Sequence, residues 1–332
     1  MEQKKPKVLL LATGGTIAGK GAPGKTTNYR PGEISVEELI ETVPGLGDLA
    51  EIKSVQFANV ASIALTHQDW LNLANLINSE FSADPELRGV VVTHGTDVLE
   101  ETAYFLHLSI KDIRPVVVVG SMRPATALSA DGPLNLLNAV KIAVSQEAEG
   151  KGVLVALNDE IHCARDVTKG NANKVETFQS PYCGPLGFVK GDNIHFYHQP
   201  SRLHTYQTVF DTSGLKDLPR VDLAYSHIMA DGAAIEAYVE RGAKGIVIAA
   251  AGAGAVTREM SQAMEKATQA GVVILLGTRC GAGLVGPARQ EMLKRGYITA
   301  DNLNPQKARV LLALALAHTD NLETIQDWFN NC

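Results

Sequence analysis

The chain has 332 residues, 45% of them hydrophobic, and carries a formal net charge of −6 at pH 7. This length suits two domains of about 150 residues each. An acidic balance without long runs of one sign argues against a nucleic-acid or membrane-surface protein, and no apolar run approaches the ~18 residues that a membrane-spanning helix needs.

The four cysteines are scattered along the chain, and none forms a C-x-x-C pair. They indicate free thiols in a reducing compartment, and not a disulfide framework. The first residues, MEQKKPK, lead directly into the first predicted strand without the apolar stretch of a signal peptide. We therefore expect a cytoplasmic protein. A periplasmic protein whose leader is missing from the sequence is the alternative.

The first predicted strand, residues 8–12, is apolar at every position, as in a strand that is buried on both faces. It ends in the segment Thr13-Gly14-Gly15-Thr16, whose adjacent glycines allow a sharp turn and a close approach by another molecule. Open α/β sheets bind their ligands at the carboxyl ends of inner strands. The hydroxyl of Thr16 is therefore a candidate for chemistry, although turn hydroxyls more commonly cap backbone groups.

Predicted strands and helices then alternate as far as residue 157. The strands are expected at 52–57, 89–93, 115–119 and 152–157, and the helices at 35–43, from 66 through 77, directly after Asp97 as far as 109, and at 134–148. This alternation predicts an α/β fold with a doubly wound, mostly parallel sheet. Three of the strand ends carry glycine beside Thr16, Thr96 or Ser121. Because parallel strands end at one edge of the sheet, these three turns together predict a site.

The pattern loosens between residues 178 and 220 and then restarts on a smaller scale. We expect an N-terminal catalytic domain over 1–205, a linker over 206–220 and a second, smaller α/β domain over 221–332. The second domain has predicted strands at 221–225, 245–250 and 272–276, and predicted helices near 233–242, 257–270, 305–317 and 322–330.

The segment from Gly19 to Thr26 matches the phosphate-binding pattern G-x-x-x-x-G-K-[ST]. In a true phosphate loop the glycines follow a strand directly, and the Lys-Thr pair opens a helix. Here the segment starts several residues after the strand, and the sequence that follows Thr26 contains Pro31 and cannot be a helix. We interpret the segment as a flexible lid with Tyr29 as its large side chain.

Other candidate sites have simpler explanations. Gly252-Ala253-Gly254 lacks the third glycine of a dinucleotide fingerprint and is typical of a tight turn. His195, His198 and His204 lie in a polar stretch without grouped acidic or thiolate ligands, which favours surface histidines over a metal site.

Two further candidates each have a structural alternative. Asp97 with Glu100 has the spacing of an ordinary helix N-terminal box. Lys169 has the surroundings of a solvated loop lysine. Taken singly, both residues fit a structural role better than a catalytic one.

Taken together, the segments resemble the bacterial-type L-asparaginase (asparaginase/glutaminase) family over essentially the whole chain. The motifs that carry the resemblance are ATGGTIAG (12–19), Asn28-Tyr29, THGTD (93–97), EETAYFL (100–106), VGSMRP (119–124), SADGPLNL (129–136), RDVTK (165–169) and LNPQKARVLL (303–312). The resemblance implies an amidohydrolase that releases ammonia from the side-chain amide of L-asparagine, or also of glutamine, without a metal or organic cofactor. It also implies a homotetramer built as a dimer of dimers, with its sites at subunit interfaces.

The same resemblance assigns roles to residues. Thr16 is implied as the nucleophile that forms an acyl-enzyme, with Tyr29 sharing its proton. Thr96, Asp97 and Lys169 are implied as a second catalytic triad. The resemblance also implies backbone N–H donors to the oxyanion and residues that hold the substrate's α-carboxylate and α-amino groups: Gly15, Thr96 and Ser121 for the oxyanion, Ser62 for the carboxylate and Asp97 for the ammonium.

Three positions depart from the family pattern. Ile63 stands where the family has a glutamine that bonds both head groups, and Ala253 stands where it has an asparagine. A glutamate contributed by the neighbouring subunit falls on Arg289 or Gln290, and a one-residue slip would bring Glu291 there. Loss of these groups favours, as an alternative, an amide, lactam or lactone substrate without a free α-amino group. A non-catalytic small-molecule binding protein is the second alternative.

Overall fold

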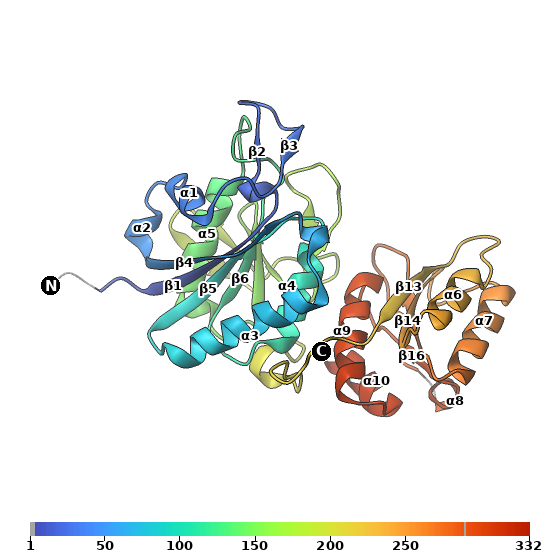
Figure 1. Cartoon of the computed structure of the whole chain (residues 1–332). Coiled ribbons are helices and arrows are strands. Elements are labelled where there is room, and N and C mark those ends of the chain that lie inside the picture. The colour runs from blue at the N-terminus through green and yellow to red at the C-terminus, as the bar shows by residue number, and fades with distance from the viewer. Residues whose placement is uncertain (1–3, 289) are drawn as a thin grey trace. The chain divides into compact units, whose positions relative to one another are not determined.

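The computed structural model describes residues 4–288 and 290–332. The chain divides into two compact units, with the division between Ser213 and Gly214 (Figure 1).

The N-terminal unit is built on an eight-stranded sheet with the order β12-β11-β8-β7-β6-β5-β1-β4. The five parallel strands are β1 (Lys7–Gly14), β4 (Glu51–Val60), β5 (Leu87–Thr93), β6 (Val116–Val119) and β7 (Val153–Leu157), and the antiparallel edge consists of β8 (Glu160–Cys163), β11 (Gly187–Lys190) and β12 (Asn193–Phe196). This α/β architecture confirms the predicted doubly wound, mostly parallel sheet. The parallel strands follow the order 2-1-3-4-5, in which ligands bind between the ends of the first and third strands. Those strands are β1 and β5.

Helices cover both faces of this sheet (Figure 1). On one face lie α1 (Val36–Glu41), α2 (Leu46–Leu49) and α5 (Gly132–Val144), and on the other lie α3 (His67–Ala83) and α4 (Leu99–Ser109). Alternate β1 side chains, those of Val8, Leu10 and Ala12, pack in the core beneath the first group. Because successive strand residues point to opposite faces, Leu9 and Leu11 pack beneath the second. The short helices are η1 (Thr16–Ala18), η2 (Ser62–Ala64), η3 (Gln146–Ala148) and η4 (Thr205–Gln207).

Local signals in the sequence account for two of these helix starts. Ser35 and Glu38 form a reciprocal capping box at α1, and Thr66 and Asp69 form another at α3. The first box confirms the start that the sequence predicted for α1. Each box satisfies two backbone donors that would otherwise lack a partner.

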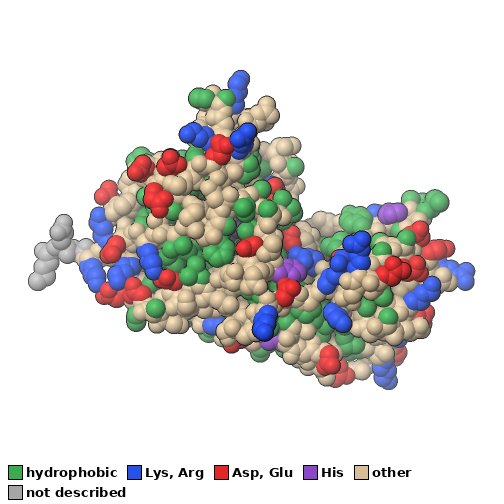
Figure 2. Space-filling model, viewed as in Figure 1, with side chains coloured by type: hydrophobic (Ala, Val, Ile, Leu, Met, Phe, Trp, Pro, Cys, Tyr) green, Lys and Arg blue, Asp and Glu red, His purple; other side chains and the backbone are tan. Residues whose placement is uncertain are grey.

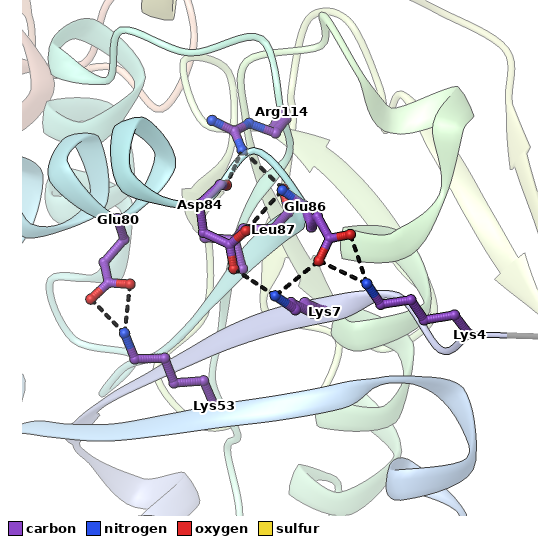
Figure 3. A network of polar contacts seen from close by, with 8 residues as sticks. All are labelled: Lys4, Lys7, Lys53, Glu80, Asp84, Glu86, Leu87 and Arg114. Atoms are coloured by element: carbon purple, nitrogen blue, oxygen red, sulfur yellow. Dashed lines mark hydrogen bonds and ion pairs between the residues drawn. The ribbon is translucent and has the colours of Figure 1, made fainter.

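Charged side chains join β1 to the turn before β5 at the amino end of the sheet (Figure 3). Lys7 Nζ lies 3.0 Å from Asp84 Oδ2 and 3.2 Å from Glu86 Oε2. Arg114 donates to the carbonyl oxygens of Phe81, Asp84 and Leu87, which anchors the end of α3. These contacts lie at the amino ends of the strands, away from the carboxyl ends where an open α/β sheet binds its ligands.

The C-terminal unit contains a parallel four-stranded sheet with the order β13-β14-β15-β16. Its strands are β13 (Val221–Tyr225), β14 (Gly245–Ala250), β15 (Val273–Thr278) and β16 (Tyr297–Thr299), and its helices are α6 (Ala233–Glu240), α7 (Arg258–Gln269), α8 (Gln290–Lys294), α9 (Pro305–His318) and α10 (Leu322–Asn331). The predicted second α/β unit is thus confirmed as a fold. The sequence did not reveal β16 and α8.

Surface charges are mixed. Figure 2 shows acidic and basic side chains interspersed over the face in view, without a continuous basic surface. Among the described residues, no helix combines the length and apolar character needed to cross a bilayer.

Candidate functional site

The turns after β1 and β5 touch through their glycines. A Cβ atom placed on Gly15 would lie only 2.3 Å from both Cα and N of Gly95, and Gly15 has a φ of +80°. Both facts require glycine, because L side chains rarely adopt this backbone conformation and no Cβ fits the space. The contact brings Thr16 and Thr96 to the same point at the carboxyl edge of the sheet.

Thr16 is paired with Tyr29. The side-chain oxygens of the two residues lie 2.8 Å apart, and Thr16 is 8% exposed. Tyr29 comes from the short hairpin of β2 (Lys20–Gly21) and β3 (Tyr29–Arg30). The next element after Thr26 is the strand β3, and not a helix, as the sequence predicted.

The hairpin is held against the rest of the unit by Thr126. The Gly21 N–H donates to Thr126 Oγ1 over 3.0 Å, and the Gly24 N–H donates to the Thr126 carbonyl over 2.9 Å. Beneath the tyrosine, a Cβ on Gly19 would lie 2.9 Å from Tyr29 Cδ2, so the ring packs directly on backbone. These contacts fix the hydroxyl of Tyr29 beside Thr16.

Thr96, Asp97 and Lys169 form a second hydrogen-bonded group. Lys169 Nζ donates to Thr96 Oγ1 over 3.0 Å and to Asp97 Oδ1 over 2.7 Å. The lysine side chain is 15% exposed and is positioned by the pairing of β9 (Thr168–Lys169) with β10 (Phe178–Gln179). Asp97 does not cap α4, because the N-cap residue is Val98 and no side chain caps that helix. Asp97 is therefore not an ordinary helix cap, and Lys169 is not a solvated loop lysine.

The backbone donors differ from those that the resemblance implies. The Gly15 N–H already donates to the Val60 carbonyl over 3.0 Å. The structure therefore gives this N–H a backbone acceptor, and the role of Gly15 toward an oxyanion stays a prediction. By contrast, the N–H groups of Thr16 and Thr96 have no hydrogen-bond acceptor among the described residues. The Ser121 hydroxyl is fully buried and donates to the Arg123 carbonyl over 2.8 Å.

Ser62 and Ile63 begin the short helix η2, directly after β4. The Ser62 hydroxyl is buried and has no partner among residues 4–288 and 290–332. A Cβ on Gly95 would lie 2.9 Å from Ser62 Oγ, so the hydroxyl lies at the glycine contact between the two turns. Ile63 is 73% exposed. The buried, unpartnered hydroxyl of Ser62 is thus followed in the chain by an exposed apolar side chain.

The remaining candidates lie in the C-terminal unit. Ala253 is exposed in the turn after β14, and Gln290 and Glu291 are exposed at the start of α8. Arg289 lies outside the described residues.

Of the three histidines weighed as metal ligands, His204 is buried and contacts Thr205 Oγ1 at 3.0 Å. Within the described part of the chain, no group of three His, Cys, Asp or Glu side chains has the arrangement of a metal site.

Sequence reasoning did not single out His94, which precedes the glycine contact. It is fully buried, and its Nδ1 lies 2.7 Å from the Gly95 carbonyl oxygen. Burial lowers the pKa of this imidazole to about 4 from an ordinary value of 6.5. The only signal in the sequence was a histidine placed between a uniformly apolar strand and a glycine turn.

Comparisons with known proteins agree with this geometry. The family model "Asparaginase, N-terminal" matches residues 7–202, and "Glutaminase/Asparaginase C-terminal domain" matches residues 220–329. The chain is 46% identical to L-asparaginase 2 of Bacillus subtilis over 326 residues. The aligned region covers 98% of this chain and 86% of that protein. It is 41% identical to the glutaminase-asparaginase of Pseudomonas fluorescens biotype A over 329 residues, and this aligned region covers 98% of this chain and 90% of that protein. A solved structure of a probable cytoplasmic L-asparaginase from Campylobacter jejuni superposes with a TM-score of 0.95 at 44% identity, covering 99% of this chain and 100% of that one.

Proposed function

The chain belongs to the asparaginase family of amide hydrolases, and from this premise we propose that it hydrolyses the side-chain amide of L-asparagine through an acyl-enzyme on Thr16, with L-glutamine as a second substrate. The observation that carries the proposal is the pair of hydroxyl groups at one glycine contact, Thr16 with Tyr29 and Thr96 with Lys169. Each hydroxyl has a proton partner within hydrogen-bond distance, as nucleophilic catalysis requires.

In the first step Thr16 Oγ1 attacks the amide carbon. The hydroxyl proton passes to Tyr29 OH, 2.8 Å away, while the tyrosine's own proton moves to the amide nitrogen. The carbon–nitrogen bond then breaks, ammonia leaves, and the acyl group remains on Thr16 as an ester. A threonine hydroxyl is a weak nucleophile at neutral pH, so the fixed proton acceptor supports its activation.

In the second step water attacks the ester carbon. The hydroxyl of Thr96 and the amino group of Lys169 form a hydrogen-bonded route for the proton that water loses. As the ester bond breaks, the proton that water gave up is passed on to Thr16 Oγ1, which restores its hydroxyl, and the acid product is released. Asp97 holds Lys169 in this position through the 2.7 Å contact.

Both steps place negative charge on the former carbonyl oxygen. The unpartnered N–H groups of Thr16 and Thr96 are the donors that we propose for this oxyanion. Removal of one such donor typically costs about 3 kcal/mol in the transition state. Ser62 lies beside them, and its hydroxyl is available to a substrate carboxylate.

A second candidate function follows from Ile63. Its exposed apolar side chain stands at the position where the family resemblance implies a glutamine that bonds an amino-acid substrate. Loss of a partner for a buried charged group costs about 2–5 kcal/mol, so Ile63 favours an amide, lactam or lactone without a free α-amino group. Asparagine hydrolysis stays the first proposal because the relatives at 41–46% identity include proteins named L-asparaginase and glutaminase-asparaginase.

Ammonia release separates the two functions. L-Asparagine, D-asparagine, L-glutamine and succinamic acid, which lacks the α-amino group, are compared for the wild type and the Ile63→Gln variant. Turnover of L-asparagine at low substrate concentration supports the first proposal and refutes the second. Preference for succinamic acid, reversed by Ile63→Gln, supports the second. No ammonia from any of the four amides, together with no acid release from a lactone, refutes both and favours a binding protein.

We also propose a homotetramer, built as a dimer of dimers, that works in the cytoplasm. The similarity to a probable cytoplasmic L-asparaginase supports this compartment, whereas a relative from Haemophilus influenzae is named as periplasmic. Light scattering tests the assembly, with a particle of four chain masses as the expected result. Cell fractionation tests the compartment.

A further inference from the structure

His94 is a buried titratable residue that the reaction above does not use. It lies between β5 and Gly95, and its own N–H donates to the Val119 carbonyl of the neighbouring strand over 2.8 Å. The side chain is fully buried, and Nε2 has no partner among the described residues. The other ring nitrogen, Nδ1, lies 2.7 Å from the Gly95 carbonyl oxygen, within hydrogen-bond distance.

This contact fixes the tautomer of the ring. A carbonyl oxygen only accepts hydrogen bonds, so the proton must lie on Nδ1. Because burial lowers the pKa of His94 to about 4, the ring is neutral around pH 7. The imidazole therefore acts as a neutral donor that faces one specific oxygen.

That oxygen belongs to the peptide unit whose N–H is contributed by Thr96. A trans peptide is planar, so its C=O and N–H groups point in opposite directions. A bond that holds the Gly95 carbonyl on the buried side consequently directs the Thr96 N–H to the other side. This N–H has no acceptor among the described residues.

The peptide needs such a restraint because Gly95 cannot carry a side chain. A Cβ there would lie 2.9 Å from Ser62 Oγ and 3.1 Å from Gly15 Cα. Glycine has the widest choice of backbone conformations, so a glycine peptide is the easiest to rotate. Because the close contact requires glycine at position 95, no side chain at Gly95 restrains the peptide that carries the Thr96 N–H.

We propose that His94 is a positioning residue that aims the Thr96 N–H at the oxyanion by holding the Gly95 carbonyl. This inference rests on the proposed amide hydrolysis and adds a specific residue to it. His94 touches neither substrate nor reacting atoms. Its effect is on the transition state, so it changes kcat far more than KM.

Three substitutions test this role. In His94→Asn, the asparagine Nδ2 donor lies the same number of bonds from Cα as the histidine Nδ1. In His94→Gln, the glutamine donor corresponds in position to the histidine Nε2. His94→Leu has no donor. We expect Gln and Leu to lower kcat for amide hydrolysis by about 10- to 100-fold at similar KM, and Asn to stay within about 3-fold of the wild type. Circular dichroism and urea unfolding confirm that each variant compared is folded.

The outcomes distinguish this proposal from the proposed function. Equal kcat in all three variants, or an equal loss in all three including Asn, overturns the positioning role while wild-type turnover upholds the hydrolysis. If the wild type hydrolyses no amide, the proposed function fails, and 15N spectra of histidine-labelled wild-type protein then decide the geometry alone. An Nδ1–H tautomer for His94 supports the bond to Gly95, and an Nε2–H tautomer overturns it.

Discussion

Substitution of Gly95 by alanine tests whether the glycine contact assembles the site. The new Cβ would lie 2.9 Å from both Cβ and Oγ of Ser62 and 3.1 Å from Gly15 Cα, against an ordinary contact of at least 3.4 Å. Ser62, which follows β4, must therefore move away from Gly95 by about 0.5 Å, and the turn after β1 must move by about 0.3 Å. A misplacement of about 1 Å can cost ~10²-fold in rate, so we expect kcat to fall by about 10- to 100-fold.

The variant should still fold, because overpacking of this kind typically costs about 1–3 kcal/mol. Ammonia release gives kcat and KM, and urea unfolding gives the free energy of unfolding. The matched control is Gly47→Ala in α2, where nothing lies within 4 Å of the new Cβ. This control should keep full activity. Wild-type kcat in Gly95→Ala would refute the reasoning, since the contact would then not set the positions of Thr16 and Thr96.

Three further predictions concern other groups. Lys169→Met removes the partner of the water-activating hydroxyl, so the acyl-enzyme should accumulate on Thr16 after a burst of ammonia; steady turnover without accumulation would contradict this assignment. The unfolded chain binds a proton on His94 at its ordinary pKa of 6.5 while the folded chain does so only at about 4. Stability should therefore fall as pH drops from 6.5 toward 4, by up to about 3 kcal/mol. Urea unfolding of His94→Leu should show a shallower pH dependence, and an unchanged one would contradict the burial of a neutral imidazole. Arg114→Met removes the guanidinium from the Asp112 carboxylate and from the carbonyls at the end of α3, and should lower the free energy of unfolding by about 2 kcal/mol. A double variant that also carries Asp112→Asn should recover part of this loss, and a double variant as unstable as Arg114→Met would contradict the pairing.

The strands of both units were predictable because most of them are buried on both faces. Residues 8–12 and 245–250 are continuous apolar runs, and the structure extends or reproduces them as β1 and β14. The strand β16, by contrast, has only three residues, so it is too short to produce a periodic pattern. Its pairing with β15 comes from tertiary packing, which no local pattern encodes.

The site was only partly predictable for a similar reason. Whether Asp97 caps a helix or pairs with a lysine depends on Lys169, which is 72 residues away in the sequence. The family resemblance assigned the Gly15 N–H to the oxyanion. Its bond to the Val60 carbonyl could not be predicted, because that bond depends on the irregular register between β1 and β4, where the pairing shifts between Ala12 and Gly14. The grouping of strand ends followed from the fold, whereas the roles of the individual residues came from the family resemblance.

The most direct test of the account is acid quench of the enzyme during turnover of L-asparagine, followed by mass spectrometry of its peptides. The account predicts an aspartyl ester on the peptide that contains Thr16. The ester should be more abundant in Lys169→Met and absent in Thr16→Ala, which should also release no ammonia above background. An acyl adduct on a different residue, or sustained ammonia release by Thr16→Ala, would contradict the central claim that Thr16 is the nucleophile.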